Sequence, residues 1–200
     1  MESETVAPRA WQLETRRLIL RPLTHSDVAA IFHLYADWEV SKNLSRIVFP
    51  FSYQAAQQFI ATAQTDLAQA SGYMLGMFQR ASDIFVGVIS LRIPSNNPQL
   101  SAEARAAVAG LGILGYAVAR PYWHQGYASE SATRMVAFAF EALGLTRLQA
   151  SPLRGNRASE RILERLNFQV TEAGVAEEPL YGGPAHLVDR YTLMRGNSTA

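Results

Sequence analysis

Short apolar runs alternate along the chain with longer stretches in which apolar residues recur at helical spacing. The short runs predict strands, which span residues 17–21, 73–78, 85–92, 110–118, 147–151, 168–171 and 187–194. The helical spacing predicts helices over about residues 28–35, 53–69, 129–143 and 158–166. Thr24 or Ser26 can cap the first helix and Ser52 the second, and Gly144 is expected to end the third.

Three polar or mixed segments separate these elements and predict loops, over residues 37–50, 94–100 and 179–184. Residues 101–108 fit either a helical turn or more loop. The resulting order is one strand, two helices, three strands, a helix, a strand, a helix and two strands. This order predicts a mixed α/β fold with many antiparallel neighbours and no regular strand–helix–strand alternation.

Length and composition fit one domain with a sizeable core, since 48% of the 200 residues are hydrophobic. We expect a flexible leader over residues 1–12, the domain over 13–195 and a tail over 196–200. The net charge of +1 gives no field that favours nucleic acid or a membrane surface. No secretory signal and no membrane-spanning run is visible, so a soluble cytoplasmic protein is the expectation.

The chain has no cysteine, which excludes disulfides, thiolate metal sites and a cysteine nucleophile. Its four histidines are far apart and no carboxylate cluster accompanies them. We therefore expect no metal site.

The segment from Tyr122 to Glu130 links a predicted strand to a predicted helix. The first amides of a helix have no partner within the helix, and its dipole places positive charge there. Gly126 allows a ligand to approach the backbone closely. The segment therefore predicts a cradle for a phosphate-bearing ligand. A structural strand–helix junction that binds no ligand is the alternative.

Six segments in order resemble the GNAT superfamily of acyl-CoA-dependent N-acetyltransferases, and within it the Rim-type branch that acetylates ribosomal-protein N-termini. These segments are residues 13–21, Gly115-Tyr116, residues 122–130, residues 143–147, Asn156 to Ser159 and residues 161–168. The resemblance implies a central twisted, mostly antiparallel sheet of about six to seven strands with a splayed central strand pair, flanked by about four helices. It also implies acetyl-CoA as co-substrate and a primary amine, on a protein N-terminus or a small molecule, as acceptor.

The resemblance further implies the residues of the cofactor site. Those expected to lie along the pantetheine arm are Tyr116, Ala117, Val118 and Asn156. Those expected to hold the pyrophosphate through backbone amides are His124, Gln125, Gly126, Tyr127, Ala128 and Ser129. Arg165 is expected near the nucleotide end. Ser159 and Tyr116 are the catalytic candidates, and Ser159 would assist the departing thiolate.

Three positions depart from the family pattern. Trp123 replaces a frequent arginine or glutamine, and Gln125 replaces a frequent basic residue. Phosphate binding is therefore expected to depend more on amides than on side-chain charge. Ile113 stands where many relatives carry a glutamate, which removes the obvious general base.

The absence of cysteine excludes an acyl-cysteine intermediate, and we expect the amine to attack the thioester directly in a ternary complex. The general base is left unassigned, and a water ordered by Tyr122, Glu130 or His186 would serve. The acceptor site is expected to contain acidic and aromatic residues from the 43–53 and 175–187 loops and their surroundings: Trp38, Glu39, Phe49, Phe51, Glu177, Glu178 and Tyr181.

Structural roles compete with several of these assignments. Ser159 and Asn156 can cap their own helix, Tyr116 can be a core residue, and Trp123 is expected to pack rather than touch phosphate. Two rival functions also stand: an acyl-CoA-binding regulatory protein without turnover, and a nucleotide-binding enzyme of doubly wound type. The absence of a Gly-x-Gly-x-x-Gly motif counts against the latter. A homodimer is compatible with the sequence.

Overall fold

The computed structural model describes residues 11–177 and 185–197, and its strands form one sheet in the order β1-β2-β3-β4-β5-β6-β8-β7. All neighbouring pairs are antiparallel except β5–β6. The strands are β1 (Leu13–Glu14), β2 (Leu18–Pro22), β3 (Gly72–Gln79), β4 (Phe85–Arg92), β5 (Leu111–Val118), β6 (Arg147–Ala150), β7 (Gln169–Glu177) and β8 (His186–Met194). The α-helices are α1 (Val28–Ala36), α2 (Trp38–Ser41), α3 (Tyr53–Ala68), α4 (Ala102–Ala107), α5 (Tyr127–Ala137) and α6 (Arg157–Arg165).

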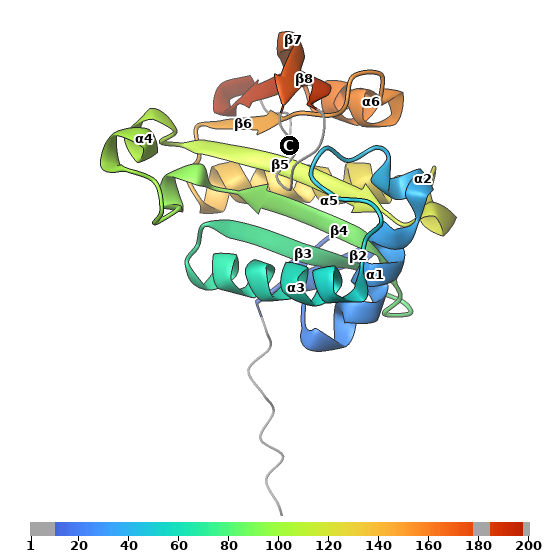
Figure 1. Cartoon of the computed structure of the whole chain (residues 1–200). Coiled ribbons are helices and arrows are strands. Elements are labelled where there is room, and N and C mark those ends of the chain that lie inside the picture. The colour runs from blue at the N-terminus through green and yellow to red at the C-terminus, as the bar shows by residue number, and fades with distance from the viewer. Residues whose placement is uncertain (1–10, 178–184, 198–200) are drawn as a thin grey trace, which may run out of the picture.

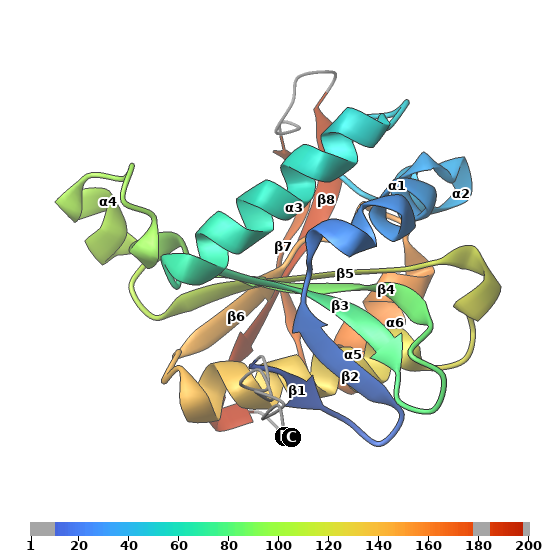
Figure 2. The same cartoon turned by 90° about the horizontal axis from the view of Figure 1, so that it is seen from below.

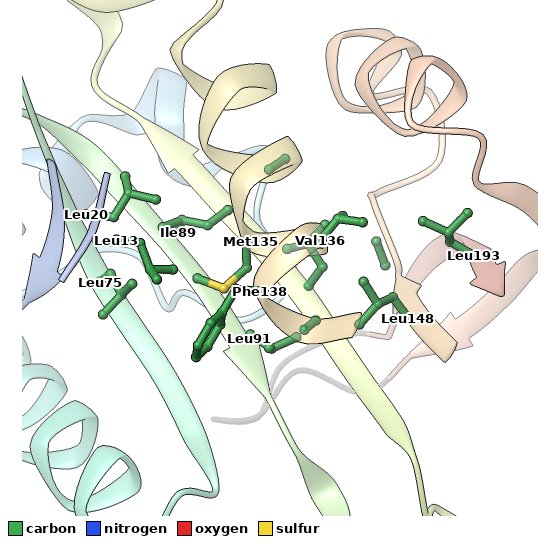
Figure 3. Packing of buried hydrophobic residues seen from close by; sticks show 14 of the residues in the cluster. Leu13, Leu20, Leu75, Ile89, Leu91, Met135, Val136, Phe138, Leu148 and Leu193 are labelled. Atoms are coloured by element: carbon green, nitrogen blue, oxygen red, sulfur yellow. The ribbon is translucent and has the colours of Figure 1, made fainter. Parts of the chain in front are cut away.

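Helices cover both faces of the sheet, with α1 and α3 on one face and α5 on the other (Figures 1 and 2). Alternate residues of each strand point to opposite faces, so each strand contributes to both cores. Val88 and Ala117 pack under α1 and α3, whereas Ile89 and Leu114 belong to the core under α5. In that second core Met135 and Val136 of α5 lie against the sheet (Figure 3).

The central strands diverge as the resemblance predicts. The parallel β5–β6 pair extends only from Leu111–Arg147 to Ile113–Gln149, although β5 continues to Val118. Five further residues of β5 therefore have no β6 partner. The same stretch remains paired with β4 on its other edge.

The predicted mixed α/β class is confirmed, but the predicted numbers of strands and helices were too low. The eighth strand is β1, which pairs Leu13 with Leu20, and Leu13 is buried. The helices missed or left open by the sequence are α2 and α4. Their turns begin where the Asp37 carboxylate accepts the Glu39 amide (3.0 Å) and the Ser101 hydroxyl accepts the Ala104 amide (3.2 Å).

Other boundaries shifted by a few residues. Helix α5 begins at Tyr127 instead of 129, and its last turn widens into a π-helix over Phe138–Ala142 before Gly144. Strand β7 runs to Glu177 instead of 171, because it pairs along most of β8 through two irregularities in register. The predicted loop at 179–184, which includes Tyr181, and the neighbouring Glu178 lie outside the described residues.

Candidate active site

The turn before α5 has the geometry expected of an anion cradle. His124 and Gly126 adopt positive φ angles of 60° and 80°, and both residues are exposed. Within the described residues, the amides of His124 to Gly126 donate no hydrogen bond. The Glu130 amide donates to the Gly126 carbonyl (3.0 Å), and the three helical amides before it lack partners one turn back. Free N–H groups therefore gather at this helix N-terminus.

A positive charge lies beside this turn, and it comes from Arg17 on the β1–β2 connection. A side-chain carbon built on Gly126 would lie 3.4 Å from Arg17 Nη2, and the guanidinium carbon lies 4.6 Å from the centre of the Tyr127 ring. The sequence motif includes Arg17, but its spacing alone does not indicate that this side chain reaches residue 126. This basic group was missed in the sequence-based site.

Glu130 holds Arg17 in place. One carboxylate oxygen of Glu130 accepts from the Thr15 hydroxyl (2.7 Å) and the Arg17 amide (2.8 Å), and the other accepts from Arg17 Nε (2.6 Å). Burial raises the pKa of Glu130, but these hydrogen bonds and the Arg17 charge outweigh it, so that the net pKa is lowered. A carboxylate held in this way is a structural anchor and a weak base.

The unpaired part of β5 presents backbone groups to the gap beside β6. The Ala119 amide donates to the Val86 carbonyl on β4 (2.9 Å). Because backbone groups alternate between the two edges of a strand, those of Ala117 also face β4, and those of Tyr116 and Val118 face the gap. Tyr116 and Val118 therefore fit the predicted pantetheine edge. The geometry gives Ala117 less support, and all three assignments remain predictions.

Trp123 packs as expected, and it also makes a hydrogen bond. Its indole Nε1 donates to the Val118 carbonyl (2.7 Å), and its ring lies against the core under α1 and α3. The Trp123 side chain therefore satisfies one of the carbonyls that face the gap, and it links the end of β5 to the turn. Gln125 donates to the Pro121 carbonyl (3.1 Å), so its side chain stabilises the loop.

The two catalytic candidates meet across the gap. Tyr116 points to the α5–α6 side of the sheet, and its hydroxyl lies 2.8 Å from that of Ser159 in the first turn of α6. The Tyr116 hydroxyl also lies 3.3 Å from the Ser159 carbonyl oxygen. Burial raises the pKa of Tyr116 to about 12, with the Ser159 hydrogen bond acting in the opposite direction. Tyr116 is thus a protonated hydroxyl at neutral pH.

The other predicted residues of α6 lie at its two ends. The Asn156 side chain accepts the Ser159 amide (3.2 Å) and so caps the helix, as the structural alternative expected. This bond fixes the first turn, from which the Ser159 hydroxyl reaches Tyr116. Arg165 is exposed in the last turn, where a cation complements the helix dipole. Its assignment to the nucleotide end remains a prediction.

The expected acceptor residues are only partly brought together. Trp38 and Phe49 are exposed and pack edge to face with ring centres 5.0 Å apart. Phe51 packs edge-on against Tyr35 in the α1–α3 core. Glu39 forms an ion pair with Lys42 (2.6 Å). Glu177 ends β7 opposite His186.

Within the described residues, no group of three or more His, Asp or Glu side chains is placed to hold a metal ion. The helices found in that same part of the chain are all too short or too polar to cross a membrane.

Comparisons with known proteins agree with this architecture. The family model described as an acetyltransferase (GNAT) domain matches residues 17–169. The uncharacterized N-acetyltransferase YoaA of Bacillus subtilis (strain 168) is 29% identical over 187 residues, which cover 92% of this chain and 96% of YoaA.

Two solved structures show the same fold. The ribosomal L7/L12 α-N-protein acetyltransferase RimL in complex with coenzyme A superposes with a TM-score of 0.74 at 19% identity, covering 92% of this chain and 98% of RimL. A Vibrio cholerae spermidine N-acetyltransferase in complex with CoA and spermine gives a TM-score of 0.71 at 15% identity, covering 90% of this chain and 96% of that enzyme. With the family model matching most of its length, this chain belongs to the GNAT acetyltransferases.

Proposed function

We propose that this protein transfers an acetyl group from acetyl-CoA directly to a primary amine, on a peptide N-terminus or a small molecule. The observation that carries the proposal is a set of three features at the unpaired end of β5 and just beyond it in the chain. These are the open edge of β5, the Tyr116–Ser159 hydroxyl pair and the free amides before α5. The CoA complexes of RimL and of the spermidine enzyme support the choice of co-substrate.

The residues present suit coenzyme A. Its pyrophosphate would be held by amides of residues 124–129, and Arg17 beside Gly126 would supply the positive charge that Trp123 and Gln125 lack. The amide-bearing pantetheine arm would bond to the open backbone groups of Tyr116 and to the amide of Val118, whose carbonyl accepts from Trp123. When bound, acetyl-CoA supplies the thioester that the amine attacks.

Ser159 and Tyr116 act on the leaving group in this mechanism. The Ser159 hydroxyl donates a hydrogen bond to the sulfur as the carbon–sulfur bond breaks, and the Tyr116 hydroxyl donates in turn to Ser159 Oγ. The attacking nitrogen gives up a proton as the amide forms, and the thiolate gains one, so that charge balances overall. The raised pKa of Tyr116 suits a group that must keep its proton until this step.

The choice of general base is narrowed, but the role is not assigned to a side chain. Glu130 is held by three hydrogen bonds and its pKa is lowered, so of the three earlier candidates it suits proton removal least. An α-amine, with an ordinary pKa of about 8, is partly neutral at pH 7, whereas a lysine amine at about 10.4 is not. We therefore infer that α-amines are better acceptors than lysine-like amines.

Release of CoA thiol from acetyl-CoA, measured against a panel of N-terminal peptides and small amines, tests the proposal. The chain itself contains no cysteine, so a thiol reagent detects only the product. Amine-dependent release, with the acetylated amine confirmed by mass spectrometry, is the expected result.

Ile113 at the position of a frequent base keeps one alternative open, a protein that binds acyl-CoA without turning it over. Tight CoA binding by calorimetry combined with no thiol release from any amine would favour that alternative. Absence of CoA binding would contradict both.

A further inference from the structure

A half-buried cation, Arg92, lies on the face of the sheet opposite Ser159. Arg92 is the last residue of β4, and its neighbours across the sheet are Gly72 on β3 and Ile113 on β5. Val88, four residues earlier on the same strand, packs under α1 and α3, so strand alternation places the Arg92 side chain on that face. Neither Gly72 nor Ile113 supplies a counter-charge.

One nitrogen of the Arg92 guanidinium has no partner within the described residues. Its Nε atom is buried and has no hydrogen-bond partner, and none of the ion pairs in that part of the chain includes Arg92. Burying a cation without a partner is costly, so its retention calls for an explanation. Burial and then the Arg46 charge lower the pKa of Arg92 to about 10, which still leaves it charged at neutral pH.

Two carboxylates stand near this cation without pairing with it. Asp66 of α3 lies over Gly72, since a carbon built on Gly72 would be 3.1 Å from Asp66 Cβ, and its carboxylate accepts from the Ser71 hydroxyl (3.3 Å). Glu177 at the end of β7 also acts electrostatically on Arg92. The site therefore holds an arginine with an open donor beside acidic groups. The arginine suits a negatively charged group of a ligand and the acidic groups suit a positively charged one, so the site matches a ligand that carries both.

The position of Arg92 relates it to the reaction gap. Ile113, its partner in register, lies two residues before Gly115 on β5, a distance of about 7 Å along the strand. Gly115 precedes Tyr116, whose hydroxyl meets Ser159 on the other face. A group bound at Arg92 would thus lie within the length of a small molecule, or of one amino-acid residue, from the amine that attacks.

We propose that Arg92 binds a carboxylate of the acceptor, so that the substrate is an amine bearing a carboxylate a few bonds away. This inference rests on the proposed acetyl transfer. Arginine recognises a carboxylate through two parallel hydrogen bonds, for which the open Nε is one donor. The carboxylate can belong to a free amino acid or to an acidic first residue of a peptide.

Pairs of acceptors with and without the carboxylate test this proposal. They also distinguish a free amino acid from a peptide as the source of the carboxylate. Thiol release is measured for amino acids against their carboxamides, and for peptides that begin with Glu against those that begin with Gln. We expect kcat/KM to favour the carboxylate by about tenfold or more in one of the two series. In Arg92→Met the preference should disappear through a higher acceptor KM, with the KM for acetyl-CoA unchanged, and Arg92→Lys should recover only part of it.

Arg105→Met is the matched control, because Arg105 is an exposed arginine on α4. It should retain the wild-type preference. Equal rates within every pair, or a preference that survives in Arg92→Met, would overturn the proposal.

A binding measurement keeps this test independent of turnover. The Arg92 Nε–H signal is identified in a ¹⁵N spectrum by its loss in Arg92→Met, and the CoA-loaded protein is then titrated with each acid and its amide. A shift with the acid alone supports carboxylate binding even if no amine is acetylated, which would count only against the proposed function. No shift with any acid contradicts the Arg92 proposal.

Discussion

At the scale of single residues, the candidate chemistry depends on two hydroxyls that are 43 positions apart in the chain. The sequence indicated both, Tyr116 after the central glycine and Ser159 after the capping asparagine, through their resemblance to family motifs. It did not indicate their 2.8 Å contact, because that contact requires β5 and β6 to diverge and α6 to begin beside the gap. Arg17 and Arg92 were missed for the same reason, since only the fold brings each to its site.

The hydroxyl pair gives a first prediction at this scale. Ser159→Ala removes the donor to the leaving sulfur, so kcat should fall about 100-fold, at the lower end of proton-transfer effects, with CoA affinity unchanged. Tyr116→Phe should lower kcat less, because Tyr116 acts through Ser159. Thiol-release kinetics and calorimetry measure both, with Thr65→Ala on exposed α3 surface as control. Wild-type turnover in Ser159→Ala would reduce that residue to a structural role.

Gly126 gives a second prediction, for which Gly144 is a matched control. Both glycines have positive φ, 80° and 67°, so an alanine at either should cost about 1 kcal/mol of unfolding free energy. Only Gly126 lies beside Arg17 in the anion cradle, and a carbon at Gly144 would meet nothing within 4 Å. We therefore expect Gly126→Ala alone to weaken CoA binding, by about tenfold in calorimetric Kd. Equal losses of affinity in both variants would argue against a phosphate site at residue 126.

At the scale of elements, the sequence predicted the long strands and helices well and the short ones poorly. Strands β3, β4 and β5 and helix α3 have strong apolar patterns and were placed within one or two residues. Strand β1 has only two residues and α2 only four, so neither carries a full period of any pattern. Tertiary contacts determine such elements. Thr15 and Arg17, next to β1, bind Glu130 on α5, which links the edge of the sheet to α5.

The contacts of Glu130 with Thr15 and Arg17 predict a pH-dependent contribution to stability. The folded-state pKa of Glu130 lies below its ordinary 4.5, so its contribution is present above 4.5 and is lost as the pH falls through the folded-state value. Glu130→Gln should therefore lower the unfolding free energy by about 2 kcal/mol near neutral pH. The difference from wild type should shrink steadily in acid.

Urea unfolding across that pH range measures this difference. Glu141→Gln is the control, because Glu141 is exposed on the π-turn and takes part in no ion pair among the described residues. If the loss of unfolding free energy in Glu130→Gln stays constant with pH, the charge of Glu130 contributes nothing to its contacts with Thr15 and Arg17.

At the scale of the whole molecule, one sheet consists of two parts joined by a short parallel pairing. Strands β1 to β5 form one antiparallel part and β6 to β8 the other, and three residue pairs between β5 and β6 connect them. Helices α5 and α6 pack in the same core beside this junction. A cofactor in the gap would replace the strand pairing that is missing, so ligand binding and the cohesion of the sheet should be coupled.

Hydrogen exchange of β5 amides tests this coupling. The amides of Tyr116 and Val118 face the gap and should exchange quickly in the free protein, whereas those of Gly115 and Ala117 face β4 and should exchange slowly. Saturating CoA stabilises the whole folded state and slows every amide that exchanges through global unfolding. If the pantetheine arm bonds to the open edge, Tyr116 should gain much more protection than Gly115, its neighbour in sequence. Equal gains at the two residues would mean that CoA stabilises the protein without lying along β5.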